Sequence, residues 1–315
     1  MSPFNNFYIM NYMIKQAQSK ITWIDIINPK QNDIDYLAKN FKFHPLILSE
    51  IIPPSTRSKV EIYDNYLFIV YQLPVYDALR RTSQATEIDF LITKDCLITS
   101  RYHSIEPIDK LFATIERNLA NREQFLQKST GHLLYEILER GLSFSLRQLT
   151  HINEKIQKIE ESMFQEKEKE MIKEISIVKR DILDQRSITR PQKAILESLL
   201  AKGARFFGKD IEIYFNDLVG DYEKIWDALD NLKETAESLE ATNNALFESK
   251  TNNIMKLLAV TTFIILPLSL IANVFGLSMQ HIPLADNPLG FWMVLAIMLV
   301  VSFTFFILAK IKKWL

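Results

Sequence analysis

The stretch "IMKLLAVTTFIILPLSLIANVF", Ile254–Phe275, is 22 residues long and carries a single charge, that of Lys256. A second stretch, "LGFWMVLAIMLVVSFTFFILA", Leu289–Ala309, is 21 residues long and has no charged residue. A helix needs about 20 apolar residues to cross the hydrocarbon core of a bilayer. The two stretches therefore predict transmembrane helices, and a pair of buried core helices is the alternative that their length disfavours.

The basic residues around these stretches predict their orientation. The connecting loop, 276–288, contains no Lys or Arg, whereas basic side chains flank the first stretch and follow the second in a short tail, 310–315. They are Lys250, Lys256, Lys310, Lys312 and Lys313. Because basic residues are retained on the cytoplasmic side, we expect a multi-pass protein of the inner (plasma) membrane, with both termini in the cytoplasm and the loop outside.

The composition of the whole chain excludes several classes of protein. The 315 residues carry a net charge of -1, which argues against nucleic-acid binding, because that function needs a basic surface. A single Cys, Cys96, excludes an intramolecular disulfide and fits a reducing compartment. The sequence has no phosphate-binding Gly loop, nucleophile elbow or metal-ligand cluster. We therefore expect neither an enzyme nor an organic cofactor.

The first part of the chain alternates in the way that β-strands do. After a leader, 1–20, the sequence "ITWIDI" predicts a strand, and "SKVEIYDNYLFIVYQLP" and "TEIDFLITKDCLITSRY" each predict a β-hairpin. A helix from about Glu106 to Asn121 would cover one face of the sheet. These elements predict an α+β cytoplasmic domain, 21–130, with an antiparallel or mixed sheet.

The middle of the chain predicts long helices. Apolar residues recur every three or four positions in 131–210, which indicates an arm of antiparallel helices with its turn near Gln165–Glu170 or near Thr189–Pro191. A stalk helix, 211–253, then runs into the first apolar stretch without a persuasive cap. Its segment from Asp221 to Glu248 contains eight acidic residues, which would either concentrate cations near a pore or form a solvated helix face.

The first apolar stretch has a polar stripe along one side. At about 100° per residue, seven side chains fall within an arc of roughly 100°. They are Asn252, Met255, Ala259, Thr262, Leu266, Ser269 and Asn273. Asparagine side chains are costly against lipid, so the stripe should either hydrogen-bond to another helix or line a pore. Since two spans cannot enclose a pore, the second interpretation requires a ring of subunits.

Several motifs resemble those of the CorA family of magnesium transporters. They are "TNNIMKLLAVTTFIILPLSLIANVFGLSMQHIPL", "KVEIYDNYLFIVYQLP", "DCLITSR", "IYFNDLVGDYE" and the terminal "KKWL". The order of parts also resembles that family, from an α/β domain through helical arms and a stalk to two C-terminal spans. The resemblance implies a homopentameric, funnel-shaped channel whose first spans line the pore.

The chain departs from the family at the pore mouth. The family carries Gly-Met-Asn there, and the matching residues of this chain are Gly276, Leu277 and Ser278. An Asn, Asn273, stands instead about one turn deeper on the polar stripe. We therefore hypothesise that the selective ring has moved inward to Asn273.

The resemblance also implies a regulatory ion site between subunits. The acid early in the stalk helix that helps to bind this ion corresponds to Asp217, with Asp77 as the candidate partner on the α/β domain and Asp221 near enough to assist. The transported ion would be Mg²⁺, with Co²⁺ or Ni²⁺ also accepted, and Mg²⁺ would serve as the regulatory ion. The altered mouth leaves two alternatives open, a zinc transporter of the same fold and a membrane-anchored scaffold or sensor that no longer transports.

Overall fold

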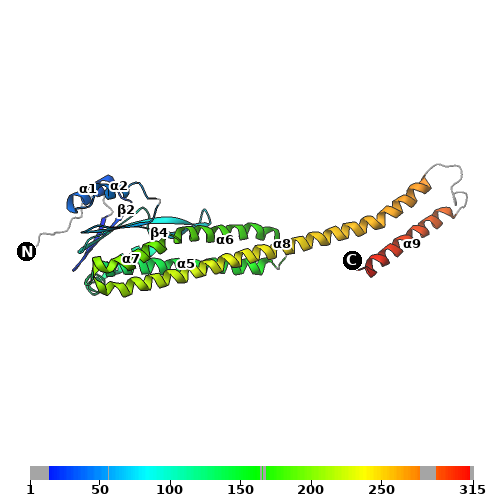
Figure 1. Cartoon of the computed structure of the whole chain (residues 1–315). Coiled ribbons are helices and arrows are strands. Elements are labelled where there is room, and N and C mark those ends of the chain that lie inside the picture. Colours follow the sequence, from blue (N-terminus) through cyan, green and yellow to red (C-terminus); the bar gives the residue numbers. More distant parts are fainter. Residues whose placement is uncertain (1–13, 56, 164, 166–167, 277–288, 313–315) are drawn as a thin grey trace, which may run out of the picture. The chain divides into compact units, whose positions relative to one another are not determined.

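The computed structural model describes residues 14–312 except 56, 164, 166–167 and 277–288. The chain divides into two compact units, Met1–Glu240 and Ala241–Leu315. The first contains a sheet with helices on both faces, and the second contains two apolar helices (Figure 1). The architecture is the predicted one of an α+β domain, long helices and two C-terminal apolar helices.

The sheet has six strands in the order β1-β2-β6-β5-β4-β3. Their bounds are Ile14–Gln18 (β1), Thr22–Ile27 (β2), Lys59–Ile62 (β3), Leu67–Asp77 (β4), Thr82–Ile92 (β5) and Cys96–Arg101 (β6). Strands β2 and β6 are parallel and all other neighbours are antiparallel, so the sheet is mixed. Both predicted hairpins are present, β3–β4 and β5–β6.

The sheet begins earlier than the expected leader, 1–20, allows. Strand β1 lies within that range and pairs with β2 from Ile14 opposite Ile26 to Gln18 opposite Thr22. Its sequence, "IKQAQ", has little alternation of its own. It is a strand because its backbone completes a ladder with β2, and local sequence does not reveal that kind of tertiary support.

Helices cover both faces of the sheet. The short helices α1 (Gln31–Asn40) and α2 (Pro45–Glu50) pack on one face over a buried apolar cluster. This cluster includes Ile24, Ile26, Leu37, Ile47, Phe68, Val70, Leu91 and Ile98. The long helices lie on the other face (Figure 1).

The helix expected from Glu106 to Asn121 is two helices, α3 (Glu106–Arg117) and α4 (Leu119–Leu126). The break lies at Asn118, whose backbone is extended at φ -155° and ψ 162°. Its side chain accepts a hydrogen bond from the amide of Asn121 at 2.7 Å. Asn118 is therefore the N-cap of α4, and this cap explains why the first helix stops.

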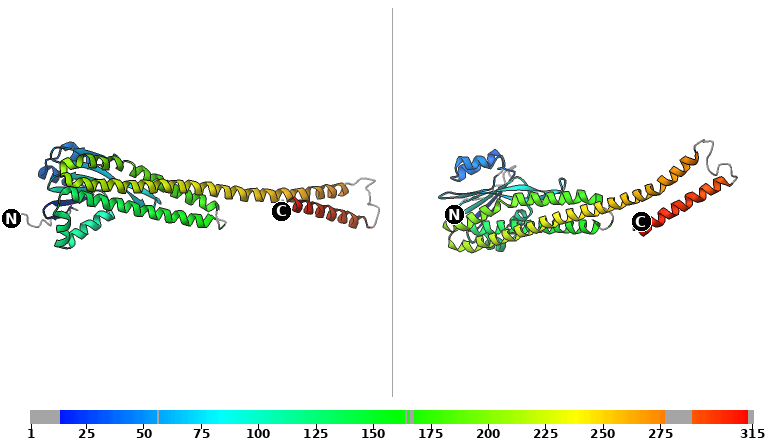
Figure 2. Two further views of the ribbon diagram at one scale, coloured as in Figure 1. Left: turned by 60° about the horizontal axis from the view of Figure 1, so that its bottom comes forward. Right: turned by 45° about the vertical axis from the view of Figure 1, so that its right-hand side comes forward.

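The arm consists of α5 (Thr130–Met163), α6 (Glu168–Thr189) and α7 (Gln192–Phe207). Helices α5 and α6 lie side by side in all three views (Figures 1 and 2), and the chain reverses between them, near the first of the two predicted turns. The second predicted turn is the junction of α6 and α7. The arm is tied to the sheet by Asp181, which accepts hydrogen bonds from the amide and the hydroxyl of Ser83, both at 2.7 Å.

A one-turn 3₁₀ helix, Lys209–Ile211, leads into α8 (Glu212–Gly276), and α9 (Gly290–Ile311) ends the described chain. The expected boundary between stalk and span at 253 lies inside α8, so the two segments form one helix. Helix α7 comes very close to α8 at Gly203, where a Cβ atom would lie 2.4 Å from Cε2 of Phe215.

Candidate ion pathway

Helices α8 and α9 carry the two apolar segments that the sequence predicts to span a membrane. Their most apolar windows have mean hydropathies of 2.2 and 2.6, and only 6% and 0% of the residues in these windows are buried. A core helix of a soluble domain would be mostly buried, and a signal sequence would lie near the N-terminus. Both helices instead expose large apolar side chains at the C-terminal end of the chain, as spans facing lipid or other subunits would.

Within this unit α8 and α9 pack through one apolar seam. The rings of Phe263 and Phe305 meet edge to face with 4.9 Å between their centroids. Val260 is 4% exposed, and Ile264 lines the same seam. This contact fixes which side of α8 faces its own second span.

The polar stripe lies on the other side of α8. Its centre is roughly 125° around the helix from the centre of the seam at about 100° per residue. All seven stripe residues, Asn252, Met255, Ala259, Thr262, Leu266, Ser269 and Asn273, are exposed. Because α9 does not cover the stripe, its polar groups must meet lipid, water or another subunit.

The two asparagines are the most informative members of the stripe. The hydroxyl of Thr262 donates to the carbonyl of Leu258 at 2.9 Å, so this polar group is satisfied inside its own helix. An exposed carboxamide at Asn252 or Asn273 has more hydrogen-bonding capacity than the helix backbone can satisfy. Exposure to lipid would therefore be costly at these two positions.

The expected pore mouth, 276–278, begins at the end of the described helix. Gly276 is the last residue of α8, and Asn273 lies one turn before it. Leu277 and Ser278 lie outside the described residues, as does the rest of the connecting loop. Among the basic residues used for orientation, Lys256 is exposed on α8 and Lys310 is in the last turn of α9, while Lys313 lies outside the described residues.

The proposed regulatory acids lie apart within one subunit. Asp217 is exposed and accepts a hydrogen bond from the hydroxyl of Tyr135 at 2.9 Å. Asp77 accepts hydrogen bonds from the amides of the turn after β4, at 2.8 and 3.2 Å, and the preceding Tyr76 lies 3.9 Å from the ammonium of Lys155. Tyr135 and Lys155 are 20 residues apart on α5, which is about 30 Å of helix. A shared ion would therefore have to lie between two subunits.

Asp221 lies one turn after Asp217 on α8 and pairs with Lys224 at 2.8 Å. Within the described parts of the chain, no three His, Cys, Asp or Glu side chains converge to hold a metal ion. One subunit alone thus presents these acids singly, each with a protein partner.

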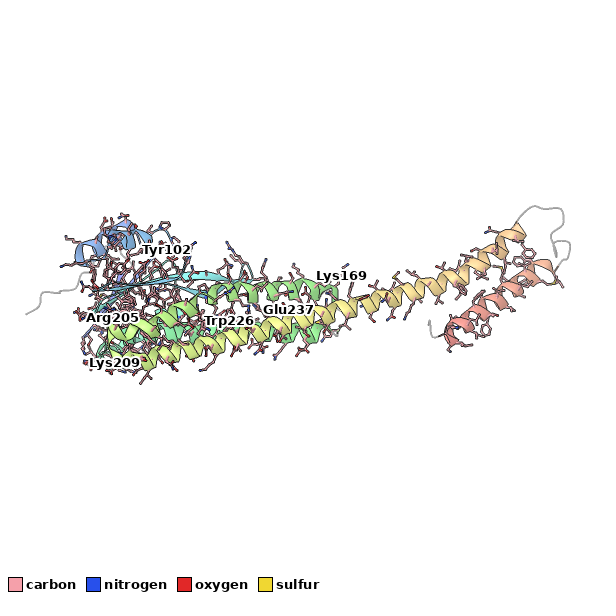
Figure 3. The ribbon with its side chains drawn as sticks, in the orientation of Figure 1. Tyr102, Lys169, Arg205, Lys209, Trp226 and Glu237 are labelled. Atoms are coloured by element: carbon pink, nitrogen blue, oxygen red, sulfur yellow. The ribbon has the colours of Figure 1, made fainter. Side chains whose placement is uncertain are left out.

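Half of the acids in the acidic segment of α8 are paired with neighbouring basic side chains. Four of its eight acids form ion pairs, namely Asp221 with Lys224, Asp230 with Arg186, Glu237 with Lys233 and Glu240 with Lys179. Arg186 also lies over the ring of Trp226, 4.6 Å from its centroid, on the part of α8 that Figure 3 labels. These contacts favour a structural role for much of the segment over a cation-concentrating one.

Sequence reasoning missed two buried acids on β5, Glu87 and Asp89. Their signal is visible in "TEIDFLI", where acids occupy alternate positions of a strand that is otherwise mostly apolar. Period-two placement puts both on one face of the sheet. Whether that face is covered depends on distant residues, which the local pattern does not show.

Comparisons with known proteins extend the likeness to the whole chain. A model of the family described as "CorA-like Mg2+ transporter protein" matches residues 18–313. The cobalt/magnesium transport protein CorA of Thermotoga maritima is 28% identical over 296 residues, which are 93% of this chain and 83% of that protein. The complete structure of the CorA magnesium transporter from Methanocaldococcus jannaschii superposes with a TM-score of 0.82 at 22% identity, covering 98% of this chain and 100% of that one. At this identity the superposition establishes a shared fold.

Proposed function

This chain belongs to the CorA-like Mg²⁺ transporter family, and we propose that it is a divalent cation channel that admits Mg²⁺ to the cell, with Co²⁺ and Ni²⁺ also accepted. The observation that carries the proposal is the exposed polar stripe of α8, on the side turned away from α9. In an ion transporter this stripe can line a water-filled pore, and the water of the pore satisfies the hydrogen-bonding groups of its asparagines.

The pore forms by self-association in the membrane. Two helices per subunit cannot enclose a channel, so the stripes of several copies must face a common axis. We propose five copies, the number implied by the family. Each subunit then turns α9 toward lipid and its stripe toward the axis, which is consistent with the apolar seam between the two helices.

Asn273 is the proposed selective residue. It precedes by five residues Ser278, the position at which the family carries its mouth asparagine. A ring of carboxamide oxygens is neutral and accepts hydrogen bonds from the water shell that Mg²⁺ is reluctant to lose. Such a ring holds the hydrated ion without trapping it, as conduction requires.

The membrane potential suffices to drive uptake. A charge gains roughly 2.3 kcal/mol per 100 mV, so a divalent cation gains roughly 4.6 kcal/mol at the same potential. No chemical step at the protein is then needed to draw the ion inward. Asp217 and Asp221, with Asp77 of a neighbouring copy, are the proposed regulatory acids that bind Mg²⁺ between subunits when it is plentiful.

Ion flux into proteoliposomes tests this function. Purified, assembled protein is reconstituted, an inside-negative potential is imposed, and Mg²⁺, Co²⁺, Ni²⁺ and Zn²⁺ are offered separately. Asn273→Ala should abolish Mg²⁺ influx. Asn253→Ala is the matched control, because it removes the same carboxamide from the opposite side of α8 and should leave influx intact, and Ser278→Ala should have a mild effect.

Other results would lead to other conclusions. Loss of flux in Ser278→Ala but not in Asn273→Ala would refute the relocated ring while retaining the channel. Flux of Zn²⁺ alone would identify a zinc transporter of the same fold. An assembled oligomer that passes none of the four ions, in Mg²⁺-free buffer, would refute transport and leave a scaffold or sensor.

A further inference from the structure

Two acidic side chains are buried on the sheet face that α1 and α2 cover. Asp89 is 1% exposed and Glu87 is 7% exposed, and we call them the buried acidic pair. They alternate along β5 with residues of the opposite face, and so share the face of Leu91 and its apolar cluster. Across the ladder, Asp89 is opposite Ser100 of β6 and Glu87 is opposite Gln72 of β4.

Within the described residues no hydrogen bond of ordinary geometry reaches the oxygens of the pair, although the Ser55 backbone lies near enough to Glu87 to oppose the rise of its pKa. This holds for both carboxylate oxygens of Asp89, both of Glu87 and the hydroxyl oxygen of Ser100, all of which are buried. The contrast is Asp25 on β2, equally buried, whose carboxylate binds Arg101 at 2.7 and 3.1 Å and the hydroxyl of Thr99 at 2.7 Å. Buried acids are normally partnered in this way, and an isolated buried charge is strongly unfavourable.

The surroundings of the pair are acidic. Glu50, at the end of α2, adds to the negative charge at Asp89, and among the described residues the cation that acts on Asp89 is Lys59 of β3. That ammonium already pairs with Glu50 at 2.5 Å and with Glu61 at 2.9 Å. The carboxylates of Glu50, Glu61 and Asp89 therefore share one ammonium, and neither buried acid has an ion pair among the described residues.

Burial and charge both act on these groups. Burial raises the pKa of Asp89 well above its ordinary value, and Glu87 and Glu50 raise it further against a smaller effect of Lys59. Burial also raises the pKa of Glu87, against a smaller opposite effect of the Ser55 backbone. The pKa of the neighbouring Tyr102 is also raised, to about 12, first by burial and then by the negative charges of Glu87 and Asp89.

The cover over the pair is the irregular segment 51–55, which follows α2 and is neither helix nor strand. The hydroxyl of Tyr102, which Figure 3 labels, donates to the carbonyl of Ile51 at 2.6 Å. The carboxamide of Gln72 donates to the carbonyl of Ser55 at 3.4 Å. Sheet and segment are thus joined on both sides of the pair, by one short and one long hydrogen bond.

We propose that Glu87, Asp89 and Ser100 hold a Mg²⁺ ion inside the cytoplasmic domain of each subunit. Two carboxylates and a hydroxyl are hard oxygen ligands, the kind that Mg²⁺ prefers. Mg²⁺ is commonly held by one or two carboxylates together with water, whereas Ca²⁺ takes six to eight oxygens. The double charge of the ion neutralises the pair. The site needs only two acids, in keeping with the absence of a three-acid cluster in the described residues.

This site is separate from the pore and from the intersubunit acids. All its ligands come from β5 and β6 of one subunit, so it does not need the oligomer. An ion there would compensate the buried charge beneath the irregular segment, and the stability of the domain would then follow the free Mg²⁺ concentration of the cytoplasm. The competing explanation is that two protons neutralise the pair.

Counting bound ions tests the proposal directly. The full-length protein in detergent is titrated with Mn²⁺, as a substitute for Mg²⁺, and free Mn²⁺ is measured by electron paramagnetic resonance. The variant Glu87→Gln/Asp89→Asn keeps the shape of both side chains and should bind one Mn²⁺ fewer per subunit. Asp95→Asn is the matched control, because it removes an exposed acid from the turn of the same hairpin and should lose none. Equal counts in the wild type and the double variant would overturn the site.

A second measurement needs only the wild type and distinguishes ion from proton. Because the pKa values of both acids are raised on folding, the pair favours the folded state at low pH, and this contribution is lost as pH rises. In EDTA the thermal midpoint should therefore fall as pH rises above the unfolded pKa values of about 4, and Mg²⁺ should restore the midpoint at the upper end of the range. In the double variant Glu87→Gln/Asp89→Asn, this site should no longer make the thermal midpoint depend on pH or on Mg²⁺. A fall with pH that Mg²⁺ does not reverse would overturn the ion and assign protons to the pair.

Discussion

The buried ion pair between Arg101 and Asp25 is the contact on which we expect the sheet to depend most. Both side chains are fully buried, and the guanidinium also binds Asp109 at 2.5 Å and the carbonyl of His103 at 3.2 Å. Burial alone would lower the pKa of Arg101, but the hydrogen bonds and charges of Asp25 and Asp109 outweigh it and raise that pKa. The cation is thus fixed in its charged form between two strands that pair in parallel.

Removing this cation should be costly because Asp25 cannot follow it into water. In Arg101→Met, the hydroxyl of Thr99 is the remaining donor to the carboxylate of Asp25 among the described residues. Breaking one side of a buried ion pair typically costs about 3–5 kcal/mol. That range corresponds to a roughly 10²- to 4 × 10³-fold increase in the population that opens locally.

Hydrogen exchange measured by mass spectrometry reports this opening without requiring the whole membrane protein to unfold in two states. Protection of peptides covering β2 and β6 should fall by that factor in Arg101→Met. The double variant Asp25→Asn/Arg101→Met should regain about 2 kcal/mol relative to the single one, since it no longer buries an unpaired charge. Protection unchanged within threefold, or additive losses in the double variant, would refute the reasoning.

Two further predictions concern packing and pH. Gly203→Ala should lower the thermal midpoint, because overpacking against Phe215 costs about 1–3 kcal/mol and exceeds a gain of about 1 kcal/mol in helix propensity. The control is Gly220→Ala on α8, where the new Cβ meets nothing within 4 Å, and this variant should raise the midpoint. A higher midpoint in both variants would contradict the close contact at Gly203. Burial would raise the pKa of Asp109, but hydrogen bonds from Arg101 and Ser104 lower that pKa overall. The contribution of Asp109 to stability is therefore present above the unfolded pKa of about 3.9 and is lost as pH falls through the lower folded pKa. Asp109→Asn should weaken the acid-induced loss of β6 protection, and an identical acid profile in the variant would show that the loss does not come from Asp109.

Periodicity in the sequence predicts the parts of this fold that are stabilised by their own pattern. Apolar residues at helical spacing, such as Ile152, Ile156 and Ile159, are buried along α5 as that spacing indicates. The hairpins follow from alternating residues around short polar turns, and the two spans from length and hydropathy. In each case the signal is local and repeated, so no single contact decides the outcome.

Contacts between distant segments decide what the sequence does not show. Strand β1 is polar and exists because β2 is beside it, and the break at Asn118 depends on one side chain turning back to cap α4. The stripe of α8 could be predicted residue by residue, but that α9 packs on the opposite side becomes visible only through the pairing of Phe263 with Phe305. The buried acidic pair is the extreme case, because its cover comes from residues more than 30 positions away on the chain.

Two of the cation sites proposed for this chain, the ring at Asn273 and the buried acidic pair, would need opposite ligand chemistry. A pore must release each ion quickly, so a neutral ring at Asn273 that contacts the water shell suits it, whereas a ring of buried carboxylates would hold a divalent ion too tightly to conduct. A site that reports Mg²⁺ through stability needs the reverse, a buried negative charge whose compensation depends on the ion. The chain places carboxamides on the exposed stripe of α8 and unpartnered carboxylates beneath the cover of β5, and each chemistry lies where its proposed task requires it.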